Sequence, residues 1–112
     1  MSSVIVDDEF YFGLQSLFRE LPESAQQVLG DRLMLDAAWK QVADGVGFTD
    51  THIGQLAFIY TSRAASQMLR EWGQRRGSTL LVLRQTLRDI ERPDIISFLD
   101  DIRKRKLTSH QA

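Results

Sequence analysis

The sequence of 112 residues contains no cysteine and only two histidines. Without cysteine, disulfide bonds, thiolate chemistry and cysteine-based metal sites are all excluded, and this composition fits a reducing compartment. The histidines, His52 and His110, stand far apart in the chain, and no carboxylates accompany either of them at the spacing of metal ligands. We therefore predict that the protein binds no metal and no cofactor.

Long apolar runs are also missing. No segment approaches the ~20 consecutive apolar residues that a membrane-spanning helix needs. The opening MSSVIVDDEF has neither a basic start nor an apolar stretch of signal length. We expect a cytoplasmic protein that is not inserted in a membrane. A chain of this length forms one domain and buries enough surface to fold without a disulfide or a metal.

Each half of the chain is poor in charge of one sign. Residues 1–50 contain nine acidic and three basic residues, whereas residues 51–112 contain eleven basic and six acidic residues. The net charge of the whole chain is −1. A small domain with an acidic and a basic flank can attract further copies of itself through these unlike surfaces.

Apolar residues recur at three- and four-residue steps through most of the chain, a pattern typical of amphipathic helices. No segment alternates polar and apolar residues over a useful length, so no strand is predicted. The predicted helices span residues 22–35, 37–47, 51–60, 63–74, 79–90 and 94–106. Their linkers are short, which favours antiparallel neighbours. We predict an all-α fold, a six-helix antiparallel bundle.

A further helix is predicted before these six, at residues 8–21, where apolar residues form one stripe. The residues of this stripe are Phe10, Leu14, Leu17, Phe18 and Leu21. We therefore divide the chain into a partly helical N-terminal extension (residues 1–20), one helical domain (residues 21–106) and a flexible polar tail (residues 107–112).

No set of residues typical of an active site is present. Asp100 and Asp101 are adjacent, so in a helix they point to different sides and favour solvated surface over a cation site. The glycines around Ser78 do not belong to a Gly-x-x-x-x-Gly-Lys-Ser/Thr run, so no phosphate-binding loop is predicted. We predict that the protein is not an enzyme and has no catalytic residue.

A nucleic-acid-binding domain is the main alternative from a different class of protein. Residues 48–72 contain two short predicted helices around a turn, an arrangement similar to a helix-turn-helix. Such a module usually has a strongly basic surface, because phosphate contacts dominate its affinity. This chain has a pI of about 6.1 and an acidic first half. We therefore expect no nucleic-acid partner.

Three motifs resemble, in their order and spacing, those of a death domain. The first is LPESAQQVLGDRLMLDAAWKQVADGVGF, in which Trp39 precedes a turn that contains glycines. The second is IGQL at residues 53–56. The third is Leu69-x-x-Trp72 followed by Gly77, Thr79, Leu83, Leu87, Ile90 and Asp94. This last spacing is most similar to that of Toll and interleukin-1 pathway adaptors and of Pelle-like kinases.

The resemblance, which covers residues 21–104, implies a six-helix bundle without catalytic activity. Death domains recruit one another through asymmetric pairs of surface patches in signalling assemblies of apoptosis and innate immunity. The resemblance therefore implies partners of the same family: adaptors, receptors, kinases and further copies of this chain. Another death-fold subtype, a caspase-recruitment or pyrin-like bundle, is a remaining alternative. Trp39 and Trp72 are expected to be core residues.

Charged residues outside the core are the predicted partner-binding residues. Arg75 and Arg76 lie in the turn after Trp72, and Arg84 and Arg88 are four residues apart and so share a helix face. Arginine suits such a surface because its planar guanidinium can hold a carboxylate through two hydrogen bonds. The predicted acidic counterparts are Asp36, Asp44, Asp50, Asp100 and Asp101. We expect these arginines to meet acidic surfaces of similar domains.

Overall fold

The structure is a computed structural model, and it describes residues 12–104. Within this range the chain forms six α-helices and two short 3-10 helices but no strand, and one isolated antiparallel bridge joins Leu17 to Thr79. The helices are η1 (Phe18–Glu20), α2 (Glu23–Met34), α3 (Ala38–Gly45), α4 (Asp50–Tyr60), η2 (Thr61–Arg63), α5 (Ala64–Gly73), α6 (Leu80–Asp89) and α7 (Pro93–Arg103). The predicted all-α fold is confirmed.

Two capping threonines and one proline mark where three of these helices begin. Thr49 and Thr79 accept hydrogen bonds through Oγ1 from the amides of His52 and Val82, at 3.1 and 3.3 Å. These amides belong to the first turn of a helix, which has no partner for them in the helix itself. Pro93 is the first residue of α7, where its missing amide removes no hydrogen bond.

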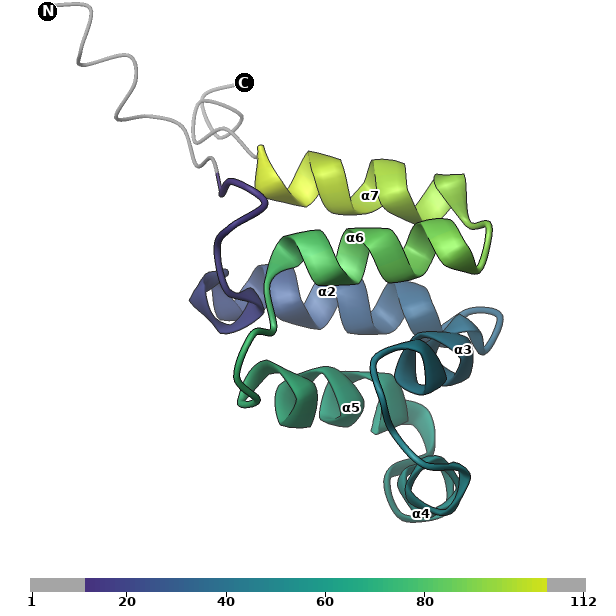
Figure 1. The fold of residues 1–112 in the computed structure, drawn as a ribbon. Helices are drawn as coiled ribbons and strands as arrows, with labels where there is room; N and C mark the ends of the chain where they lie inside the picture. The colour runs from purple at the N-terminus through teal and green to yellow at the C-terminus, as the bar shows by residue number, and fades with distance from the viewer. Residues whose placement is uncertain (1–11, 105–112) are drawn as a thin grey trace, which may run out of the picture.

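The axes of α2, α5, α6 and α7 lie roughly parallel or antiparallel to one another, and α3 and α4 cross them at one end (Figure 1). The helix α4 lies at the opposite edge of the bundle from α7 (Figure 1). Large side chains of the core include Phe18, Leu29, Leu33, Trp39, Phe48, Met68, Leu69, Trp72, Leu80, Leu83, Leu87, Ile95 and Leu99. Trp39 and Trp72 are only 2% and 4% exposed, as expected of core residues.

The contact between α2 and α5 depends on a glycine. A Cβ atom at Gly30 would lie only 2.3 Å from the Oγ atom of Ser66, so the two helices approach more closely than any larger residue at Gly30 would allow. This close packing brings α2 against the helix that carries Trp72 and leads into the turn before α6.

The helix predicted at residues 8–21 is wrong over the part that the structure describes. Residues 12–17 are not helical, and only Phe18–Glu20 form a 3-10 turn, while residues 8–11 lie outside the described range. The backbone of this segment forms hydrogen bonds with distant residues: Phe12 N to Arg103 O, Phe18 N to Ser78 O, Leu80 N to Ser16 O and Leu81 N to Leu14 O. These tertiary hydrogen bonds replace those that a local helix would have formed.

Candidate interaction surfaces

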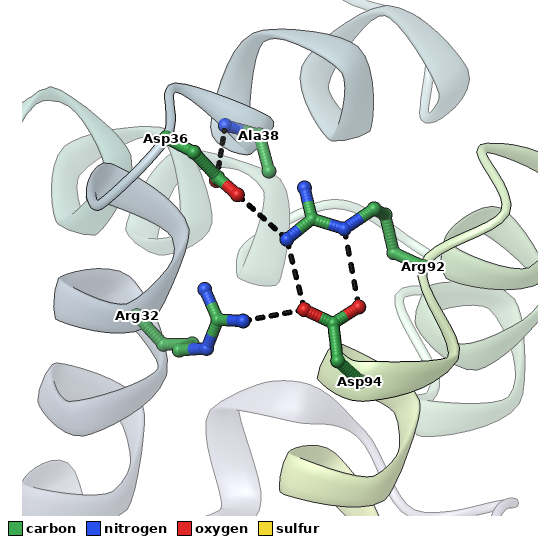
Figure 2. A network of polar contacts seen from close by, with 5 residues as sticks. All are labelled: Arg32, Asp36, Ala38, Arg92 and Asp94. Atoms are coloured by element: carbon green, nitrogen blue, oxygen red, sulfur yellow. Dashed lines mark hydrogen bonds and ion pairs between the residues drawn. The ribbon is translucent and has the colours of Figure 1, made fainter.

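Four charged side chains connect the end of α2 and the loop after it with the loop before α7 and the first turn of α7 (Figure 2). Arg92, between α6 and α7, donates to both carboxylate oxygens of Asp94, at 3.1 and 2.9 Å, and to Asp36 at 2.6 Å. Arg32, near the end of α2, also donates to Asp94. The other oxygen of Asp36 accepts from the amide of Ala38, the first residue of α3, at 3.3 Å. We call Arg32, Asp36, Arg92 and Asp94 the corner clamp.

The corner clamp favours the charged forms of its members. The hydrogen bond from Arg92 lowers the pKa of Asp94 to about 2 and also lowers the pKa of Asp36. The hydrogen bonds to Asp94 and Asp36 in turn raise the pKa of Arg92. Asp36 was predicted to bind a partner, and the structure places its carboxylate in contacts that hold α2, α3 and α7 together.

Arg84 and Asp100, two further predicted partner-binding residues, pair with each other. The Nε and Nη2 atoms of Arg84 donate to the two carboxylate oxygens of Asp100, each at 3.1 Å, and so connect α6 with α7. Asp100 also accepts from Arg103 at 3.2 and 2.9 Å. Burial opposes ionisation of Asp100, but the hydrogen bonds from Arg84 and Arg103 outweigh it and lower the pKa of Asp100. Arg84 therefore turns toward α7 and does not share an open face with Arg88.

The turn between α5 and α6 carries two more of the predicted arginines, Arg75 and Arg76. The Cζ atom of Arg75 lies 4.1 Å from the ring centroid of Phe48, in the loop between α3 and α4. The ring of His52 also packs against Phe48, with 4.9 Å between ring centroids. Phe48 is buried and Arg75 is exposed, and a cation over an aromatic ring contributes ~0.5–2 kcal/mol, so this contact holds the turn against the loop. Arg76 is exposed and forms no ion pair with any residue in the described range.

Three acidic side chains gather around one open groove. Asp44 at the end of α3, Asp50 at the start of α4 and Asp89 at the end of α6 line this groove together with Lys40. Asp44 and Asp50 are exposed and have no ion pair within residues 12–104. The sequence predicted Asp44 and Asp50 as binding residues but missed Asp89, because only the packing of α6 beside α3 brings it to them. We call Asp44, Asp50 and Asp89 the acidic groove.

The remaining predicted residues, Arg88 and Asp101, lie apart from these groups. Arg88 is exposed near the end of α6. Asp101 is exposed on α7 and lines a small groove with Val28 and Phe98. In the part of the chain that the structure describes, neither of the two charged residues forms an ion pair.

The helix α4 exposes two large apolar side chains that the sequence analysis did not single out. Phe58 and Ile59 are 85% and 64% exposed. The buried residues of this helix are Ile53 and Leu56, and Phe58 and Ile59 do not belong to that apolar stripe. Large apolar residues outside the buried stripe of a helix are the sequence signal that could have identified them. Large exposed apolar side chains are candidates for contact with another protein when they form a contiguous patch.

The surface of residues 12–104 offers charged and apolar side chains but no metal site. Among residues 12–104, no three histidine, aspartate or glutamate side chains come together in a way that could hold a metal ion. None of the helices in this range is both long and apolar enough to cross a membrane. The exposed side chains of this range include arginines, carboxylates and five large apolar residues: Val28, Leu35, Phe58, Ile59 and Val82.

A family model described as Death domain matches residues 26–103, which is more than half of the chain. The chain therefore belongs to the death-domain family, and the resemblance found in the order of the Trp39, IGQL and Trp72 motifs is confirmed. Death domains are protein–protein interaction modules, not enzymes. Comparisons with curated proteins and with solved structures found no match.

Proposed function

We propose that this death domain recruits other death domains, including further copies of itself, into a signalling assembly held by unlike charged surfaces. The proposed basic surface is the turn after α5, with Arg75 and Arg76; Arg88, near the other end of α6, is a further basic residue apart from this turn. The acidic surface is the acidic groove, with Asp101 as a further acidic residue on α7. A contact between two unlike surfaces does not close on itself, so each bound domain leaves a free surface for the next one.

The observation that carries this proposal is the division of the charged residues into two sets. Arg84 and Arg92 each donate two or more hydrogen bonds to aspartates of the same chain. Arg76 and Arg88 have no acidic partner within the described residues, so their guanidinium groups are available to a carboxylate of another domain. Asp44 and Asp50 are available in the same sense to an arginine.

Charged contacts alone are weak, since an exposed ion pair contributes only ~0–1 kcal/mol. Phe58 and Ile59 would supply apolar area at the interface, because α4 begins beside the acidic groove and exposes both side chains further along. We therefore propose that binding combines several charged contacts with burial of these two residues.

We further propose a cytoplasmic role in innate immunity or apoptosis. The support is the spacing of Leu69, Trp72, Gly77 and Asp94, which is similar to that of Toll and interleukin-1 pathway adaptors and of Pelle-like kinases. The proposed partners are accordingly the death domains of an adaptor, a receptor or a kinase.

A charge-reversal variant with Arg76→Glu and Arg88→Glu tests the proposal. Both residues are exposed, so helicity by circular dichroism and the Tm should stay near wild type. Light scattering of the purified chain should show that its assembly is lost. Wild-type assembly should also weaken as salt is added, because screening shortens the reach of exposed charges to about 8 Å at physiological ionic strength. Arg75 is left unchanged because it packs on Phe48.

A complementary variant with Asp44→Arg and Asp50→Arg provides the matched control. This variant alone should also fail to assemble. A mixture of the two variants should assemble again, because each reversed surface then meets an oppositely charged one. Undiminished assembly of both variants on their own would show that these charges do not form the interface.

A further inference from the structure

The residues before α2 cross the ends of two later helices. Residues 12–21 precede the part of the chain that the family model matches, 26–103. At one end, the amide of Phe12 donates to the carbonyl of Arg103, at 2.9 Å, and its carbonyl accepts from the Arg103 guanidinium, also at 2.9 Å. We call residues 12–21 the N-terminal strap.

The strap supplies acceptors for the first amides of α6. The amide of Leu80 donates to the carbonyl of Ser16 at 2.8 Å, and the amide of Leu81 donates to the carbonyl of Leu14 at 2.9 Å. Amides in the first turn of a helix have no partner in the helix itself. If the strap moves away, these two donors lose their acceptors and the start of α6 loosens.

Phe18 anchors the strap to the turn that follows α5. Its side chain is 1% exposed, and its ring centroid lies 5.7 Å from that of Trp72. A Cβ atom at Gly73 would lie 3.2 Å from the ring of Phe18, a tight contact that would push the ring outward by a few tenths of an ångström. The amide of Phe18 donates to the carbonyl of Ser78 at 2.8 Å, and the hydroxyl of Ser78 donates to the carbonyls of Gly73 and Arg75 at 3.1 and 3.0 Å.

We infer that the N-terminal strap fixes the turn at residues 74–79 and thereby controls how Arg75 and Arg76 are presented to a partner. This inference rests on the proposed function of that turn. Phe18 is then a positioning residue: it touches no partner, but it holds the backbone from which the arginines project. Displacing the strap lowers assembly without changing any charge on the surface.

Two substitutions that keep every charge test the strap. Gly73→Ala adds one methyl group against the ring of Phe18, and Phe18→Ala removes that ring. Hydrogen exchange at the amides of Leu80 and Leu81 should become about tenfold faster, because their hydrogen bonds to the strap are weakened. Light scattering should show reduced assembly of the same variants, while exchange in α2 and α3 stays at wild-type rates.

The matched control is Gly13→Ala, which makes the same substitution within the strap. A Cβ atom at Gly13 meets no other atom within 4 Å, so exchange and assembly should both stay at wild-type levels. If Phe18→Ala accelerates exchange throughout the domain, the milder Gly73→Ala decides the question. Wild-type exchange at Leu80 and Leu81 in Gly73→Ala would overturn the structural role of the strap.

The outcomes separate this inference from the proposed function. Fast exchange at Leu80 and Leu81 with full assembly would overturn the claim that the strap controls presentation of the arginines. Assembly that persists after Arg76→Glu with Arg88→Glu would instead overturn the proposed function, whatever the exchange rates are. Fast exchange and reduced assembly in Gly73→Ala, with neither change in Gly13→Ala, would support the inference that the strap controls the presentation of Arg75 and Arg76.

Discussion

Arginines follow a helix at both the corner clamp and the turn after α5, but the fold uses them differently. Arg92 has an aspartate two residues further on, and it donates to Asp94 and to the distant Asp36. Arg76 has no acidic residue within four positions in the sequence, and no ion pair within the described residues. The side chain of Arg92 is 21% exposed, whereas Arg76 is an exposed residue.

This difference shows that residues of one type have two separate roles in the same domain. The arginine of the clamp stabilises the junction of α2, α3 and α7, while an unpaired arginine contributes little to the fold and remains available to another molecule. A charge-reversal variant is therefore informative about partner binding only where the arginine is exposed and unpaired. At an arginine of the corner clamp, loss of assembly would also follow from loss of the fold.

The largest effect on stability is expected for Trp72→Ala, which removes the ring that packs against Phe18 of the N-terminal strap. We expect a loss of ~3–5 kcal/mol in the free energy of unfolding, because the side chain is 4% exposed and leaves a cavity. Urea denaturation followed by circular dichroism measures this loss. A loss below about 1 kcal/mol would mean that the end of the bundle near the turn does not depend on this core residue.

A smaller effect should distinguish the two kinds of arginine directly. Arg92→Gln leaves Asp36 and Asp94 without their shared donor, so the Tm should fall. Arg88→Gln removes the same charge from an exposed position without an ion pair, and stability should change by no more than about 0.5 kcal/mol. Differential scanning calorimetry of both variants makes the comparison. Equal Tm values for the two variants would contradict a stabilising role of the corner clamp.

The smallest effect on the Tm is expected from protonation of the corner clamp at low pH. Asp94 has a pKa of about 2 in the folded state, below its ordinary value of 3.8. A carboxylate with a lowered pKa stabilises the fold fully above its unfolded pKa, and this contribution is lost as the pH falls through the folded value. The Tm of the wild type should therefore fall between about pH 4 and about pH 2. The pKa values of Asp36 and Asp100 are also lowered, so their contributions change in the same direction.

The Arg92→Gln variant is the control for this pH dependence. Its Tm should fall less over the same pH range, because Asp94 no longer has the hydrogen bond that lowers its pKa. Thermal melts across this range in both proteins test the expectation. An identical pH dependence would assign the acid sensitivity to carboxylates outside the clamp.

Much of the fold followed from local pattern. The spacing of apolar residues predicted six helices, and a threonine and a proline begin α4 and α7 as their side-chain chemistry requires. The helix predicted at residues 8–21 was wrong over the described part, although its apolar spacing suits a helix. There, hydrogen bonds to α6 and α7 and burial of Phe18 outweigh local helix propensity.

The candidate surface was predicted less completely. The sequence selected Arg76, Arg88, Asp44 and Asp50 as charged positions, but nothing in it separates them from residues that pair within the chain. Arg84 and Asp100, for example, lie 16 residues apart and meet only because α6 packs beside α7. The assignment of any of these residues to partner binding stays a prediction.

The sequence by itself determined the helices, most of the apolar core and the division of charge between the two halves of the chain. The helices and the core depend on neighbours within about one helical turn, and the charge of each half follows from its composition, so all three can be read from the sequence. Only the tertiary structure decided which charges are paired and where the N-terminal strap lies. Arg92 and Asp36 are 56 residues apart, and Phe12 and Arg103 are 91 apart. Contacts at such separations depend on how whole helices pack, because packing alone brings these groups within hydrogen-bonding distance.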